Sequence, residues 1–224
     1  MLVLPVVFIL VLALHGFFAD ASEPRHITCG SAIRLRHLES TKYFLTSTSS
    51  KYRSGEQVVT CSVDDRGDLL WQIKEAHNTT WCTAGELIRC GDVVRLTHLK
   101  TNRNLHTNMN RAPLTRSNLE VSGFGNNNGL GDTGDNWRIE CLQHKEGMET
   151  EYSAVDESSL LWMSNTLVRF KHVETEQYLT TSKKRKYDQT NCPNCPIVGE
   201  LEVSAGRQSA DSVFRADNGV YLRK

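Results

Sequence analysis

Hydrophobic and polar residues alternate along several short segments of the chain, and one such segment occurs three times. The copies read Ile33-Arg34-Leu35-Arg36-His37, Val94-Arg95-Leu96-Thr97-His98 and Val168-Arg169-Phe170-Lys171-His172. In each copy two apolar residues and the histidine share one face of an extended chain, and cationic or polar residues occupy the other face. This period of two predicts a β-strand with one buried face.

The likeness between the copies continues after this strand. Counted without gaps from each histidine, Tyr43-Phe44 corresponds to Asn104-Leu105 and to Tyr178-Leu179, and Thr46 corresponds to Thr107 and Thr181. Each copy then has a loop rich in glycine, serine or asparagine and a further short strand. It closes on an aromatic residue, which is Trp71, Trp137 or Phe214. Recurrence in register predicts an internal threefold repeat.

A single copy, with about four short strands, cannot cover its own apolar face. Three copies can close on one another and so remove most exposed strand edges. The mature chain holds no long 3.6-residue apolar pattern, so we expect little helix. The sequence therefore predicts an all-β fold, a single β-trefoil domain over residues 22–224, with repeats at about 28–82, 87–142 and 158–217.

The amino terminus has the pattern of a secretion signal. Leu2 to Leu14 is almost unbroken apolar sequence, and Ala19-Asp20-Ala21 follows as a small-x-small cleavage pattern. The apolar run is too short for a bilayer, which needs about 20 residues of helix. We expect a signal peptide at residues 1–21 and a mature protein without a membrane span, located in the endoplasmic reticulum lumen or secreted.

Cysteine positions follow the repeats. Cys29 and Cys90 stand at equivalent places before the first strand of two copies, and Cys82 and Cys141 each follow the closing tryptophan of the same copies. The simplest pairing is Cys29–Cys82 and Cys90–Cys141, each bracketing one repeat, although sequence does not prove connectivity. An oxidising compartment permits such bonds.

The remaining cysteines pose a separate question. Cys192-Pro193-Asn194-Cys195 is a CxxC motif, and a local disulfide is the leading interpretation. A redox-active pair and half of a zinc site stay open as alternatives. Cys61 is then the odd thiol. Asn78-Thr79-Thr80 is a sequon for N-glycosylation, which a secretion signal makes relevant.

Composition narrows the function. Lys+Arg and Asp+Glu number 26 each, and the isoelectric point is about 7.1, so the basic footprint of a nucleic-acid binder is missing. We find no phosphate-binding glycine loop after a strand, no G-x-S-x-G and no H-E-x-x-H. We therefore expect that the protein is not an enzyme and binds no cofactor or metal.

Three local features could still carry chemistry. His37, His98 and His172 could form a threefold metal site, but their place on an apolar face favours structural histidines. Lys183–Lys186 is basic, and we expect a solvated loop tip, with contact to acidic clients or glycans as the alternative. Asn126–Asp132 hints at calcium, yet Leu130 occupies a position that needs an oxygen ligand, which favours a turn-rich loop.

The middle copy carries a family resemblance. It reads Ile88-Arg89-Cys90-Gly91, Arg95-Leu96-Thr97-His98, Asn104-Leu105-His106-Thr107, Ala112-Pro113-Leu114, Leu119-Glu120-Val121-Ser122-Gly123-Phe124-Gly125 and Asp132-Thr133-Gly134-Asp135-Asn136-Trp137. These motifs resemble MIR repeats, and the chain from about Thr28 onward is similar to stromal cell-derived factor 2-like proteins. The resemblance implies three MIR repeats, residence in the endoplasmic reticulum, and a non-enzymatic role in protein quality control. It also implies a DnaJ-type co-chaperone and unfolded client proteins as partners.

The chain departs from the family pattern in places. The family's LHSHD reads Phe44-Leu45-Thr46-Ser47-Thr48 in the first copy, and only His106 remains in the second, with Asn108 at the second histidine position. The sequence ends Tyr221-Leu222-Arg223-Lys224, whereas many members end in an HDEL-like retrieval signal. The alternative function is a secreted glycan-binding β-trefoil, with Asn104, His106 and Asn108 as its ligand-binding residues.

Overall fold

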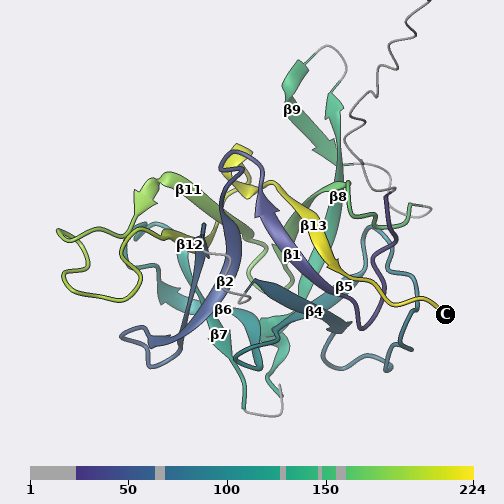
Figure 1. Cartoon of the computed structure of the whole chain (residues 1–224), viewed down its shortest axis with the longest axis horizontal. Coiled ribbons are helices and arrows are strands. Elements are labelled where there is room, and N and C mark those ends of the chain that lie inside the picture. The colour runs from purple at the N-terminus through teal and green to yellow at the C-terminus, as the bar shows by residue number, and fades with distance from the viewer. Residues whose placement is uncertain (1–23, 64–68, 127–129, 146–147, 155–159) are drawn as a thin grey trace, which may run out of the picture.

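The computed structural model describes residues 24–63, 69–126, 130–145, 148–154 and 160–224 (Figure 1). The predicted signal peptide lies outside these ranges. The described chain is an all-β structure with two short 3-10 turns, η1 (Thr133–Asp135) and η2 (Ala210–Ser212). Its strands are β1 (Ala32–His37), β2 (Phe44–Lys51), β3 (Gln57–Ser62), β4 (Leu70–Glu75), β5 (Val93–His98), β6 (Arg103–Arg111), β7 (Leu119–Phe124), β8 (Trp137–Lys145), β9 (Met148–Ala154), β10 (Leu167–His172), β11 (Tyr178–Lys186), β12 (Leu201–Gly206) and β13 (Phe214–Val220).

The first and last strands of the three repeats close into a barrel. Within repeats, β1 pairs with β4, β5 with β8 and β10 with β13. Between repeats, β4 pairs with β5, β8 with β10 and β13 with β1. These pairings form a ring without a free edge, which satisfies the backbone groups that an open sheet would expose.

The middle strands of each repeat form hairpins that cover one end of the barrel. The hairpins are β2–β3, β6–β7 and β11–β12, and their second strands β3, β7 and β12 pair with one another. A side chain of each hairpin also bonds the next hairpin in cyclic order. Ser122 donates to Glu56, Asn118 donates to Ser204 at 3.0 Å, and Thr60 donates to Glu200.

The apolar faces of the six barrel strands point into the barrel, where the closing aromatics Trp71, Trp137 and Phe214 are fully buried. The indole N–H of Trp71 donates to the carbonyl of Leu45 at 3.0 Å, and that of Trp137 donates to the carbonyl of Leu105 at 2.9 Å. The side chain of Phe214 has no N–H to donate, so the aromatic residue of the third repeat contributes through packing and not through this hydrogen bond.

The hairpins show that the gapless alignment of the first copy was wrong by one residue. Ser47, Thr107 and Thr181 each donate to the carbonyl of the facing strand, at 3.0, 2.8 and 2.9 Å. Ser47, and not Thr46, is therefore the equivalent of the two threonines. The reason is that the connection after β1 is one residue longer. The backbone N–H of His37 bonds the carbonyl of Tyr43, six residues on, whereas the backbone N–H of His172 bonds the carbonyl of Gln177, five residues on.

The structure contains one hairpin that sequence patterning did not predict. Strand β8 continues past the barrel and pairs with β9, and this hairpin projects from the body of the molecule (Figure 1). Its sequence is too polar for the apolar alternation that identified the other strands. Across the described ranges there is no helix with the length and hydropathy needed to cross a membrane.

Candidate functional site

The three equivalent histidines hold the repeats together. His98 lies 4.9 Å from Trp71, His172 lies 5.1 Å from Trp137, and His37 lies 5.3 Å from Phe214, measured between ring centroids. Each imidazole thus packs on the closing aromatic of the preceding repeat in cyclic order. These three separate contacts favour the structural interpretation over a shared metal site.

Burial also keeps two of these imidazoles neutral. It lowers the pKa of His37 from 6.5 to about 4 and lowers the pKa of His172. The Nε2 of His37 lies 3.0 Å from the carbonyl of Asp211, and the Nε2 of His172 lies 3.1 Å from the carbonyl of Gly134. A neutral imidazole that donates from Nε2 to a carbonyl pairs that N–H with the oxygen without burying a charge.

Repeat 2 contains a buried polar network centred on Asp135. The Asp135 carboxylate accepts from the side-chain amide of Asn104 at 2.8 Å, and it lies 3.0 Å from Nε2 of His77 and 3.1 Å from Nδ1 of His106. Burial acts to lower the pKa of His106, but the hydrogen bond and charge of Asp135 outweigh it, so this pKa is raised. The network therefore favours a protonated His106 next to a buried carboxylate.

Two glycines let the 130–136 segment close over this network. A methyl group at Gly131 would overlap the Asp135 carboxylate, and one at Gly134 would overlap the His106 ring. Asp132 lies 3.6 Å from Nδ1 of His106, so His106, Asp132 and Asp135 are close enough to hold a metal ion. Both oxygens of Asp135 already have protein partners, and the hydrogen bonds account for the cluster as an anchor of this segment.

The predicted ligand residues divide between two environments. Asn104 and His106 belong to the buried Asp135 network, whereas the half-buried Asn108 donates its amide to Glu56 at 3.0 Å. Sequence reasoning did not include Asp135 or His77, because nothing local marks the contact of Asp135 with β6 or with His77. The role of these residues in ligand binding stays a prediction.

A groove of about 950 Å³ lies between the hairpins β6–β7 and β11–β12. Its walls include Met109 and Arg111 from the second repeat, and Lys184, Arg185 and Arg207 from the third. The basic run Lys183–Lys186 was the sequence signal for this region, and its residues are exposed at the end of β11, as expected for a solvated tip. The groove itself was not predicted, because its two walls come from different repeats.

Comparison with known families matches residues 25–192 to the MIR domain. The chain belongs to the MIR domain family. It also matches the stromal cell-derived factor 2-like protein of Dictyostelium discoideum with 34% identity, over 96% of this chain and 96% of the relative. Stromal cell-derived factor 2 of Homo sapiens is 32% identical, over 95% of this chain and 91% of its own length. The resemblance inferred from the sequence motifs is confirmed.

Solved structures agree with this MIR assignment. The crystal structure of the SDF2-like protein from Arabidopsis thaliana has a TM-score of 0.72 and 33% identity, covering 89% of this chain and 98% of that one. A protein O-mannosyl-transferase 2 of Danio rerio is 36% identical, but over 57% of this chain and only 18% of the enzyme. The MIR domain thus occurs both in proteins of this size and as a small part of a large transferase.

The disulfides of this MIR-domain protein are the predicted ones. Cys29 bonds Cys82 and Cys90 bonds Cys141, with Cα atoms 6.1 and 5.5 Å apart, so each bond brackets one of the first two repeats. Cys61 is free and fully buried, and burial raises the pKa of its thiol. A thiol in that state is a core residue of low reactivity.

The CxxC motif forms a local disulfide between Cys192 and Cys195, the leading of its three interpretations. Both cysteines pack against a small apolar cluster of Val58, Tyr187 and Ile197, separate from the barrel core. The β11–β12 connection therefore has its own support beside the first hairpin.

Two further predicted features lie on exposed loops. Asn78 is exposed in a turn with φ 62°, and Trp81, three residues on, is 84% exposed. This position is accessible to a glycan, and modification of Asn78 stays a prediction. In the Asn126–Asp132 segment, residues 127–129 lie outside the described ranges, and the side chain of Asn126 accepts from the backbone N–H of Leu130 at 3.2 Å, as in a turn.

Proposed function

We propose that this protein is a non-catalytic subunit of protein folding quality control in the endoplasmic reticulum lumen, which binds a DnaJ-type co-chaperone and unfolded clients. The observation that carries the proposal is the whole-chain match to stromal cell-derived factor 2-like proteins, over 96% of both chains for the Dictyostelium relative. The transferase relative, by contrast, shares only 18% of its length with this chain.

We infer further that the domain is a β-trefoil. The barrel ring, the three capping hairpins and the cyclic contacts between repeats support this assignment. A rigid scaffold of this kind carries function on its hairpins and loops, where sequence can vary without loss of the core.

The state of the polar residues supports a role without catalysis. The buried carboxylate of Asp135 is enclosed by Asn104, His77 and His106. The imidazoles of His37 and His172 bond backbone carbonyls and pack on aromatic rings. A general base needs to reach a substrate proton, which these enclosed groups do not.

The test combines binding and client protection. The oxidised mature chain, residues 22–224, is mixed with a purified DnaJ-type co-chaperone of the endoplasmic reticulum, and complex formation is measured by size-exclusion chromatography. In parallel, turbidity is followed after dilution of a chemically denatured reporter protein. We expect a stable complex that slows aggregation more than the co-chaperone alone. If no complex forms and aggregation is not slowed, the proposal is refuted.

The match to an O-mannosyl-transferase supports the alternative of a secreted glycan-binding module. That alternative predicts binding on a glycan panel that is lost in Asn108→Ala, a change at a half-buried residue outside the Asp135 network. It also predicts that most of the protein is found in the culture medium, with no chaperone bound.

A further inference from the structure

We infer that the groove between the hairpins β6–β7 and β11–β12 binds an acidic peptide segment of a partner or client protein. The inference rests on the proposed protein-binding function and names the chemistry of what is bound. At about 950 Å³ the groove is within the size range of ligand-binding clefts.

The first argument is charge without a partner. Arg111, Lys184, Arg185 and Arg207 all line the groove, and all four are exposed. Among the residues that the structure describes, none of these four side chains has an ion pair or hydrogen bond, whereas Arg36, Arg95 and Lys171 are paired with carboxylates. Their charges are therefore available to a bound carboxylate.

The second argument comes from the internal symmetry. A smaller groove of about 570 Å³ lies beside the first hairpin, lined by Thr46, Ser47, Thr48 and Ser49 of that hairpin and by Lys100 and Thr101 of the second repeat. The strand pairing is interrupted at the same place in both hairpins, between Ser47 and Lys51 in one and between Thr181 and Lys186 in the other. The interrupted segment reads Thr48-Ser49-Ser50 in the first repeat and Ser182-Lys183-Lys184-Arg185 in the third.

The first hairpin thus forms with a neutral segment at this place, so the hairpin does not need the cations of the third repeat in order to fold. Arg111 stands at the end of β6, on the opposite wall from Lys184 and Arg185. Positive charge on both walls surrounds a bound anion, which a single solvated strand end would not do.

The third argument distinguishes a peptide from a long polyanion. Glu174, which precedes β11, and Asp211 of η2 line the same groove. Glu202 also lines it, but its carboxylate accepts the backbone N–H groups of Leu114 and Thr115. A uniformly sulfated chain running through the groove would meet the charges of Glu174 and Asp211.

A short acidic stretch followed by neutral or apolar residues avoids that repulsion. It places its carboxylates at the end of β6 and β11 and its neutral part over the serine and threonine hydroxyls of the floor. The side chain of Met109, 78% exposed beside the cationic end, offers an apolar contact. These features favour an acidic peptide segment over a sulfated polysaccharide.

The experiment measures fluorescence anisotropy of a labelled peptide with consecutive glutamates followed by leucine and serine, titrated with the oxidised mature protein. We expect saturable binding that weakens with added salt, because exposed charges are screened beyond about 8 Å at physiological ionic strength. The double variant Arg111→Glu/Arg185→Glu should weaken binding roughly tenfold or more, since two attractive contacts become repulsive.

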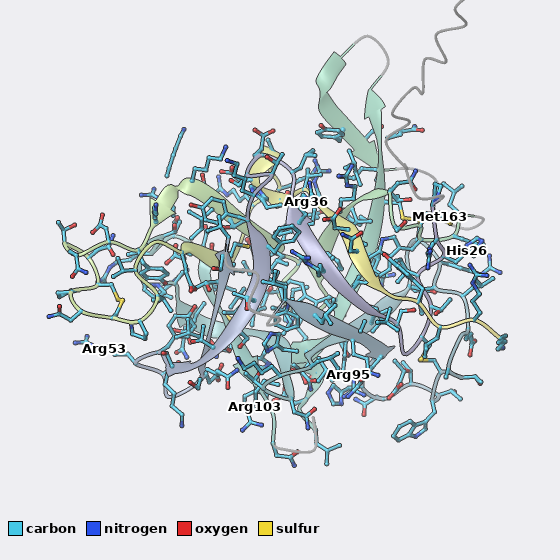
Figure 2. The ribbon with its side chains drawn as sticks, viewed as in Figure 1. His26, Arg36, Arg53, Arg95, Arg103 and Met163 are labelled. Atoms are coloured by element: carbon cyan, nitrogen blue, oxygen red, sulfur yellow. A yellow bond between two sulfur atoms is a disulfide. The ribbon has the colours of Figure 1, made fainter. Side chains whose placement is uncertain are left out.

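A matched control keeps the same change in net charge. Lys51→Glu/Arg53→Glu alters two exposed cations of the first hairpin, and Figure 2 shows Arg53 at the outer end of that hairpin. We expect this control to bind the peptide as the wild type does. Equal loss in both variants would overturn the inference, because binding would then follow net charge and not the groove.

Two other outcomes would also overturn it. One is absence of peptide binding to the wild type, and the other is binding of heparin alone with sensitivity to Arg185→Glu, which would make the groove a site for sulfated glycans. The proposed function is judged separately by the co-chaperone and client assays. If those succeed and the peptide does not bind, only the groove assignment fails; if the peptide binds and they fail, only the co-chaperone role falls.

Discussion

The first two repeats and the third have the same strand arrangement but are stabilised by different disulfides and side-chain hydrogen bonds. Repeats 1 and 2 are bracketed by the Cys29–Cys82 and Cys90–Cys141 disulfides, and their closing tryptophans hydrogen-bond a neighbouring carbonyl. Repeat 3 has no bracketing disulfide, closes on Phe214 and carries its disulfide in an exposed connection.

The difference shows which contacts the fold needs in every copy. All three repeats keep an aromatic residue against the histidine of the next repeat, and all three keep the strand pairings of the ring. Disulfides and the indole hydrogen bond are additions. Repeat 3, held by packing and by its neighbours, instead differs from the first repeat at its hairpin, where Lys184 and Arg185 line the groove.

The largest effect should come from the disulfides. On the chain-entropy model, closing a loop with a sequence separation of 51 stabilises by about 4 kcal/mol, whereas a separation of 3 gives about 2 kcal/mol. We therefore expect Cys90→Ser/Cys141→Ser to lower the free energy of unfolding by about twice as much as Cys192→Ser/Cys195→Ser, measured by urea denaturation. Equal losses would show that the local disulfide also supports the body of the fold.

Acidification should weaken the contact between repeats 3 and 1. The pKa of His37 is 6.5 when unfolded and about 4 when folded, so the unfolded state binds more protons between these values. Stability from this residue is present above pH 6.5 and is lost as the pH falls toward 4, by up to about 3 kcal/mol.

Urea denaturation at a series of pH values checks this slope, and His37→Gln should flatten it. The raised pKa of His106 acts in the opposite direction, because its contribution is present at low pH and is lost as the pH rises through the folded value. A slope that His37→Gln leaves unchanged would assign the acid sensitivity to other groups.

Replacing the closing tryptophan of repeat 2 by phenylalanine, the residue type that closes repeat 3, should lower the free energy of unfolding by a smaller amount. Trp137→Phe removes the N–H that bonds the carbonyl of Leu105 and leaves space in the core, for a loss of about 2 kcal/mol. Trp71→Phe should behave alike, since its indole makes the same bond to Leu45. Thermal unfolding by circular dichroism measures both, and losses near zero would mean that packing alone holds this position in every repeat.

The smallest effect should follow from Asp135→Asn, at a position where repeat 3 has Ser212 and repeat 1 has Leu69. The amide keeps the shape but removes the charge, so we expect a loss of about 1 kcal/mol and a lower pKa of His106. Titration of the His106 ring followed by NMR measures this pKa directly. A pKa of His106 that does not fall would contradict the dominance of Asp135 in the network.

The sequence by itself determined the class of fold and the order of its parts. Alternation along Ile33–His37 and its two copies specified strands with one buried face, because side chains on a strand point to opposite sides in turn. Recurrence of Cys29 and Cys82 as Cys90 and Cys141 predicted the bracketing disulfides that the structure contains, because equivalent residues of a repeat occupy equivalent places. The family followed from motifs that lie close together along the chain.

Tertiary structure alone decided what the polar residues do. Asn104 and His106 were predicted as ligand-binding residues, since nothing near them in sequence reveals that both bond the buried Asp135, which also bonds His77. The one-residue shift at Ser47 became visible only in its bond to the opposite strand. The groove likewise exists only where hairpins of two repeats meet, so its charges converge through strand pairing between residues far apart in the chain. Periodicity records which way a side chain points, whereas its partner depends on contacts that the closed barrel creates.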